Sequence, residues 1–166
     1  MEPYPLTFEP ILIKKVWGGR TLERFGKHLP KDVSIGESWE LADLPESIPH
    51  GRSVISNGPL AGLTLNQNFP LLIKFLDACD NLSVQVHPSI AYANAHPESH
   101  LKSEAWVILD TTPEGLIYVG LKEGTTEVAL RASIQNDTVP ALLNAINVKK
   151  GECYYLPSGT CHALGA

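Results

Sequence analysis

The sequence predicts a mainly β fold, a jelly-roll barrel of short antiparallel strands decorated by a few short helices. Branched and aromatic residues, which favour strands, gather in short runs instead of long amphipathic stretches. The 13 glycines and 13 prolines stand at short intervals between these runs, where they favour turns. The 166 residues contain no repeat and no low-complexity tract, so we expect a single domain over residues 1–166.

Seven segments have the composition of strands. In chain order they are residues 11–13, 38–42, 71–76, 82–87, 104–109, 116–119 and 152–156. The turn signals Pro157 and Gly159 then predict a further short strand that begins near His162. Helical patterns are fewer: residues 21–25, the residues after Pro88 up to Ala95, and residues 126–134 and 139–145. In the last two, Leu130, Ile134, Leu142 and Ile146 fall at helical spacing.

Composition and charge argue against several classes of protein. The formal net charge is -5 and no block of like charges occurs, which argues against nucleic acid and membrane surfaces as main partners. No apolar run approaches the ~20 residues of a membrane-spanning helix, and the proline-punctuated start is unlike a secretory signal. We therefore expect a cytoplasmic protein. Cys79, Cys153 and Cys161 form no Cys-x-x-Cys pair, so we expect three small buried or half-buried thiols.

The segment LSVQVHP, residues 82–88, carries a polar face. In a strand, alternation places Ser83, Gln85 and His87 on one side and the apolar residues on the other. Taken alone, this segment favours an ordinary surface strand whose polar face is solvated.

Glu104 stands at the beginning of a strongly apolar strand. A buried carboxylate costs several kcal/mol unless it is paired or bound to a cation. Lys102 lies on the same side as Glu104 if the segment is extended. The alternative is an exposed lysine–glutamate pair at the mouth of a strand.

The most specific signal is the spacing of Gly151, Pro157, Gly159 and His162. It resembles the second conserved motif of the cupin superfamily, whose jelly-roll barrels hold a metal with a histidine at this place. A plain hairpin with a surface histidine is the alternative. Cys161 would point to the opposite face of the strand from His162, so we do not expect it to be a ligand.

Together, Gln85, His87, Glu104 and His162 offer two imidazoles, one carboxylate and one amide oxygen from three separate strands. Such ligands suit Zn²⁺, with Mn²⁺, Fe²⁺, Co²⁺ or Ni²⁺ possible by the same chemistry. We expect one zinc ion per chain.

The whole chain resembles the mannose-6-phosphate isomerases, specifically their short bacterial form. Six segments carry the resemblance in order: VWGGR (16–20), IGESWE (35–40), LIKFLDA (72–78), LSVQVHP (82–88), KSEAW (102–106) and SGTCHALG (158–165). The resemblance implies a zinc-dependent, cupin-type aldose–ketose isomerase that interconverts mannose 6-phosphate and fructose 6-phosphate. It also implies zinc ligation by Gln85, His87, Glu104 and His162. Gln85 replaces the first histidine of general cupins, which favours the isomerases.

The resemblance further places Lys102 at the phosphosugar substrate. Ser83 and Lys74 are weaker candidates for the substrate pocket, and Trp17 and Trp39 are expected in the core or the pocket wall. Family members are considerably longer, with a catalytic arginine beyond the histidine that matches His162.

We therefore expect this chain to be the amino-terminal part of a longer protein that binds metal and isomerises poorly. A non-catalytic metal- or sugar-binding cupin module is the main alternative. An Fe²⁺ dioxygenase fits less well, because four protein ligands leave little room for oxygen.

Overall fold

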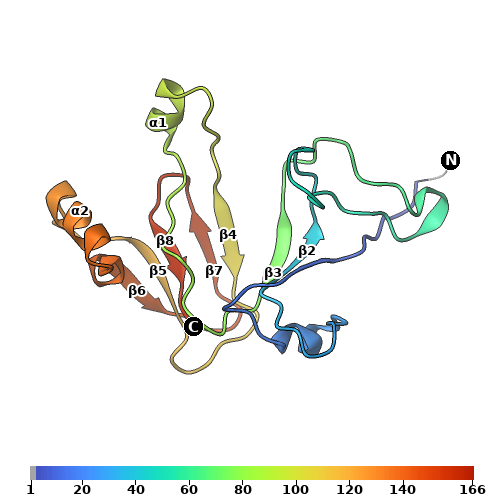
Figure 1. Cartoon of the computed structure of the whole chain (residues 1–166), viewed down its shortest axis with the longest axis horizontal. Helices are drawn as coiled ribbons and strands as arrows, with labels where there is room; N and C mark the ends of the chain where they lie inside the picture. Colours follow the sequence, from blue (N-terminus) through green and yellow to red (C-terminus); the bar gives the residue numbers. More distant parts are fainter. Residues whose placement is uncertain (1–2) are drawn as a thin grey trace. The chain divides into compact units, whose positions relative to one another are not determined.

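The computed structural model describes residues 3–166, which fold into two compact units, one ending at Cys79 and one beginning at Asp80 (Figure 1). Short strands dominate both units and helices are few, which confirms the mainly β prediction. The strands form three separate antiparallel sheets, and within residues 3–166 they do not close into a barrel. None of the helices in this part of the chain has the length and apolar character needed to cross a membrane.

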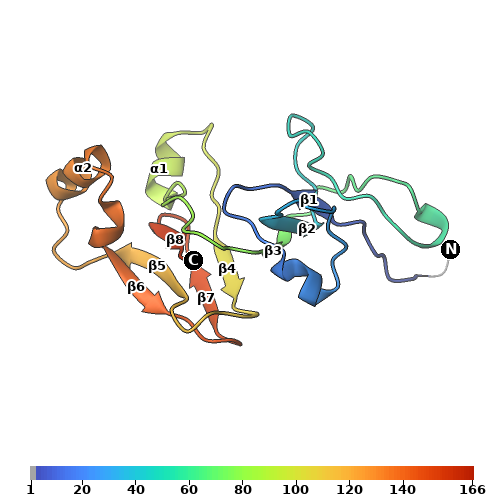
Figure 2. The same cartoon turned by 60° about the horizontal axis from the view of Figure 1, so that its bottom comes forward.

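The first unit is built on one sheet, in which β2 lies between β1 and β3 (Figure 2). Its elements are β1 (Ile11–Ile13), the 3-10 helix η1 (Thr21–Phe25), β2 (Glu37–Leu41), the 3-10 helix η2 (Gly58–Leu60) and β3 (Ile73–Leu76). Gly26 ends η1 with a φ of 77°, a conformation that suits glycine. Leu22, Ile35 and Ile55 are buried and form the core of this unit. The sequence predicted every element here except η2.

Glu37 is a buried carboxylate on β2. Its Oε2 accepts hydrogen bonds from Trp39 Nε1 at 2.7 Å and Lys74 Nζ at 3.1 Å, and its Oε1 lies 3.6 Å from Lys15 Nζ. Burial alone would raise the pKa of Glu37, but these donors and charges outweigh it and hold the pKa below its ordinary value. Lys74, a candidate for the substrate pocket, is thus an ion-pair partner within the first unit.

We expect Glu37→Gln to lower the free energy of unfolding by about 1–3 kcal/mol near neutral pH, because the substitution leaves two lysines without their carboxylate. The folded pKa lies below the unfolded one, so the stabilisation is complete above about pH 4.5 and is lost as the pH falls through the folded pKa. The difference between wild type and variant should therefore shrink in acid. Urea unfolding curves at neutral and acid pH, with the exposed Glu123→Gln as control, measure it. A difference that persists undiminished in acid would contradict this account.

The second unit contains two small sheets, one pairing β4 with β7 and one in the order β6–β5–β8. Its elements are α1 (Ile90–Ala95), β4 (Glu104–Val107), β5 (Leu116–Leu121), α2 (Glu127–Gln135), the 3-10 helix η3 (Val139–Leu142), β6 (Leu143–Asn147), β7 (Cys153–Leu156) and β8 (His162–Leu164). Ser89 and Thr126 cap α1 and α2 with their hydroxyls. Leu156, Ile117 and Leu143 are almost fully buried and form the core.

The prediction of a strand over residues 82–87 is wrong. This segment is extended, but it makes one isolated bridge, in which Gln85 and His162 exchange both backbone hydrogen bonds at 2.8 Å. A regular antiparallel ladder would next bond Ser83 N to Leu164 O, whereas Leu82 N makes that bond at 2.9 Å. The one-residue shift interrupts the ladder next to Gln85.

The predicted helix over residues 139–145 is also wrong. Its first part is η3, where Pro140 is tolerated because it stands in the first turn, and the remainder belongs to β6. Leu143 and Ile146 pair with Leu121 and Ile117 of β5. Pairing with β5 therefore outweighs the helical spacing of the apolar residues.

The expectation of buried or half-buried thiols holds for Cys161 alone. Cys161 is half-buried, whereas Cys79 and Cys153 are exposed, and all three are free. Cys153 lies opposite Val107 in the β4–β7 pair, and the side chains on that face of the pair are exposed.

Candidate metal centre

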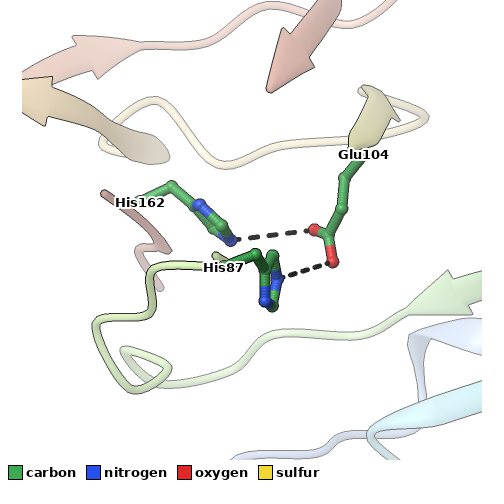
Figure 3. A group of neighbouring side chains, drawn as sticks. All are labelled: His87, Glu104 and His162. Carbon is green, nitrogen blue, oxygen red and sulfur yellow. Dashed lines mark ion pairs between the residues drawn. The ribbon is translucent and has the colours of Figure 1, made fainter. Parts of the chain in front are cut away.

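Three side chains from separate segments of the second unit converge on one point (Figure 3). His87 follows the extended segment, Glu104 begins β4 and His162 begins β8. Glu104 Oε1 lies 3.3 Å from His87 Nε2, and Glu104 Oε2 lies 3.8 Å from His162 Nε2. One ligand atom from each of the three residues falls within 4.8 Å of the others. The structure therefore brings together three of the four residues that the sequence identified as metal ligands.

The β4–β7 pair and a tryptophan orient Glu104. Glu104 lies opposite Leu156, and alternation along β4 places Trp106 on the same face as Glu104. Trp106 Nε1 donates to Glu104 Oε2 at 3.1 Å. The rings of Trp106 and His162 pack edge to face, with their centroids 5.5 Å apart. Trp106 thus holds both the carboxylate and one imidazole in place.

His162 is held in the tautomer that a metal requires. Its Nδ1 lies 2.8 Å from Thr160 O, and because a carbonyl only accepts hydrogen bonds, Nδ1 carries the proton. In the neutral imidazole, Nε2 then keeps its lone pair and faces Glu104. The side chain is buried, so this orientation is fixed by packing as well as by the hydrogen bond.

His87 presents a buried nitrogen without a hydrogen-bond partner. Its Nε2 lies 3.3 Å from Glu104 Oε1 and has no hydrogen-bond partner within residues 3–166. Burial, followed by the positive charge of Lys102, lowers the pKa of His87, which favours the neutral ring. A neutral imidazole with an unpartnered buried nitrogen beside a carboxylate is suited to a cation.

Glu104 carries the negative charge of the group. Burial would raise the pKa of Glu104, but the hydrogen bond and charge of Lys102 outweigh it and lower the pKa, with smaller contributions from Trp106 and His162. Lys102 Nζ lies 2.7 Å from Glu104 Oε1, so the two side chains lie on the same side of the chain, as the sequence predicted. The Lys102 side chain is half exposed, so its ammonium also reaches solvent.

Gln85 lies directly opposite His162 in their isolated bridge. Residues opposed in this way direct their side chains to the same face of the pair, so Gln85 and His162 share a face. The Gln85 amide nitrogen donates to Ser83 Oγ at 3.3 Å, which leaves its carbonyl oxygen as the candidate fourth ligand. Gln85 and Ser83 are both exposed, and the substrate role of Ser83 stays a prediction.

The donor set fits a borderline divalent cation. Two neutral imidazole nitrogens, a carboxylate and an amide oxygen leave a net positive charge on a bound Zn²⁺, and such a site can keep a position open for substrate or water. Sequence reasoning missed Trp106 and the carbonyl of Thr160. Alternation along the strand could have placed Trp106 beside Glu104, whereas no sequence signal identifies a backbone carbonyl as a histidine partner.

Comparison with known proteins places these residues in a family context. The model of the phosphomannose isomerase type I catalytic domain matches residues 6–114. Mannose-6-phosphate isomerase ManA of Bacillus subtilis is 38% identical over 99% of this chain and 56% of its own length. A crystal structure of the mannose 6-phosphate isomerase from Bacillus subtilis, at 34% identity, superposes with a TM-score of 0.80 over 97% of this chain and 55% of that one.

A more distant structure shares the fold. Mannose 6-phosphate isomerase from Salmonella typhimurium, bound to its substrate f6p and zinc, superposes with a TM-score of 0.62 at 19% identity, over 96% of this chain and 65% of that one. The chain spans about half the length of the curated relatives it matches.

Proposed function

Because the chain belongs to the phosphomannose isomerase type I family, we propose that it carries the metal centre of a zinc-dependent isomerase of mannose 6-phosphate and fructose 6-phosphate. The observation that carries the proposal is the convergence of His87, Glu104 and His162, with a buried His87 nitrogen that has no hydrogen-bond partner. The names of the relatives support the reaction, and a related structure that contains zinc supports the metal.

We assign metal binding to His87, Glu104 and His162, with Gln85 as the fourth ligand. When bound, zinc supplies positive charge that stabilises negative charge on the oxygens of the sugar. The chain's own residues orient that ion. Trp106 holds the carboxylate of Glu104, and the carbonyl of Thr160 keeps the lone pair of His162 directed at the metal position.

Lys102 is our candidate for the group that acts on the substrate. Aldose–ketose isomerisation moves a proton between two neighbouring carbons while negative charge builds on their oxygens. A half-exposed ammonium beside the metal ligands is suited to stabilise that charge. Ser83 and Lys74 remain candidates for binding the phosphosugar. The cytoplasmic location and the single cupin-like domain expected from the sequence also stay predictions.

Isomerase activity tests the proposal directly. We expect the protein that carries this chain to stop forming fructose 6-phosphate from mannose 6-phosphate when the metal is removed with a chelator, and to resume when zinc is restored. Activity that survives complete metal removal would contradict the role of zinc. Zinc binding without isomerisation by that longer protein would instead favour the non-catalytic metal- or sugar-binding module.

A further inference from the structure

Several hydrogen bonds beside the candidate metal centre converge on one residue, Ser158. This half-buried residue lies in the turn between β7 and β8. We infer that Ser158 is a positioning residue whose hydroxyl fixes the ligand-bearing segments relative to one another. The inference rests on the metal binding proposed above and adds a determinant of affinity that lies outside the ligand set.

The Ser158 hydroxyl uses both its donor and its acceptor capacity. Its Oγ donates to Pro88 O at 2.6 Å and accepts from Lys102 N at 3.0 Å. These roles are fixed, because a carbonyl only accepts and a backbone N–H only donates. Pro88 follows His87 directly, and Lys102 precedes Glu104 by two residues. One hydroxyl therefore joins the segment that carries His87 to the segment that carries Glu104.

The backbone of the same turn adds two further links. Ser158 N donates to Ser103 Oγ at 3.1 Å, and Gly159 N donates to His87 O at 2.9 Å. Gly159 has a φ of 96°, and a Cβ at this position would lie 3.0 Å from Ser89 Cβ. The turn thus packs closely against the residues that follow His87, and it leads into β8, which presents the second histidine.

These links matter because the segment before His87 is not held by a strand ladder. Its regular pairing with β8 is limited to the bridge at Gln85. Metal–ligand distances tolerate deviations of only about 0.2 Å, so the segments need other restraints. Without the Ser158 hydroxyl, Pro88 O and Lys102 N lose their partner, and the His87 and Glu104 segments lose the direct link between them.

The test compares serine-to-alanine variants of the full chain. We expect Ser158→Ala to weaken zinc binding by ~10- to 100-fold, the effect typical of outer partners of metal ligands. Competition with a chromophoric chelator measures the affinity, and the visible absorption spectrum of the Co²⁺-loaded chain reports the ligand geometry. Ser158→Thr keeps the hydroxyl and should restore most of the affinity.

Ser133→Ala is the matched control. Ser133 is buried in α2, and its hydroxyl donates to Leu130 O at 2.9 Å, so the substitution also removes one hydroxyl hydrogen bond from the second unit. It should leave the zinc affinity and the Co²⁺ spectrum unchanged.

Each outcome separates the inference from the proposed metal site. Equal zinc affinity in wild type and Ser158→Ala overturns the inference and leaves the metal centre standing. Equal weakening in Ser133→Ala means that affinity follows general stability, which also overturns it. A wild-type chain that binds no zinc overturns the metal centre together with the inference. If Ser158→Ala does not fold, Ser158→Val decides when it is compared with Ser158→Thr, because the two side chains have nearly the same shape and differ in the hydroxyl that binds Pro88 O and Lys102 N. Equal zinc affinity in these two variants overturns the inference.

Discussion

His162→Ala and His87→Ala are each expected to raise the zinc dissociation constant by at least ~100-fold, beyond the range seen for outer partners of metal ligands. Both histidines direct Nε2 toward Glu104, at 3.8 Å and 3.3 Å from its oxygens. Removing either one leaves a single imidazole with two oxygen ligands, and imidazole suits zinc better than carboxylate or carbonyl oxygens do. Competitive titration against a chelator of known affinity measures the loss.

Two control variants test whether the loss is specific to the assigned ligands. Cys161 neighbours His162 in the chain, and burial raises the pKa of its thiol, which disfavours the thiolate that binds metals. Cys161→Ser should therefore leave zinc affinity nearly unchanged. His100→Ala removes an exposed histidine and should do the same. An equal loss in Cys161→Ser and His162→Ala would show that the ligand face of β8 is misassigned.

The strands that the sequence identified are those in which composition and turns agree. β1 spans the predicted residues, and the bounds of β2, β3, β4, β5 and β7 lie within two residues of those predicted. The errors occur where pairing partners decide the outcome. Leu143 belongs to a strand because β5 offers a partner for it, and residues 82–87 fail to form one because their register with β8 shifts. Neither partner is visible in a local pattern.

Three residues of the candidate site stand out in the sequence, but the groups that hold them do not. His87, Glu104 and His162 each stood out as polar groups within apolar or tightly turned segments, and the structure brings all three together. The sequence could not identify the groups that hold them. Ser158 hydrogen-bonds to backbone atoms of residues that are far away in the chain. The Thr160 carbonyl is a backbone group that contacts the ring of His162, two residues further on. Such contacts depend on the folded arrangement and leave no spacing pattern.

Lys102 and a bound cation would compete for the same oxygen of the Glu104 carboxylate. The Lys102 ammonium lies 2.7 Å from Glu104 Oε1, so it competes with a metal for that oxygen. Replacing Lys102 with methionine preserves the length of the apolar stem and removes the competing charge. Zinc affinity should therefore stay the same or increase, unlike the result for a ligand variant.

Turnover, unlike zinc affinity, should fall in Lys102→Met. We expect isomerisation by the protein that carries this chain to fall by at least ~100-fold with zinc fully bound, because a positioned charge or proton-transfer group contributes about this much to a transition state. Lys122→Met is the matched control, since the Lys122 ammonium donates to Ala141 O and the lysine is exposed. Both variants are assayed by coupled detection of fructose 6-phosphate, after their zinc content has been measured. Wild-type turnover in zinc-loaded Lys102→Met would reduce Lys102 to a surface partner of Glu104, whereas loss of zinc along with turnover would mean that Lys102 acts on the metal centre instead of the sugar.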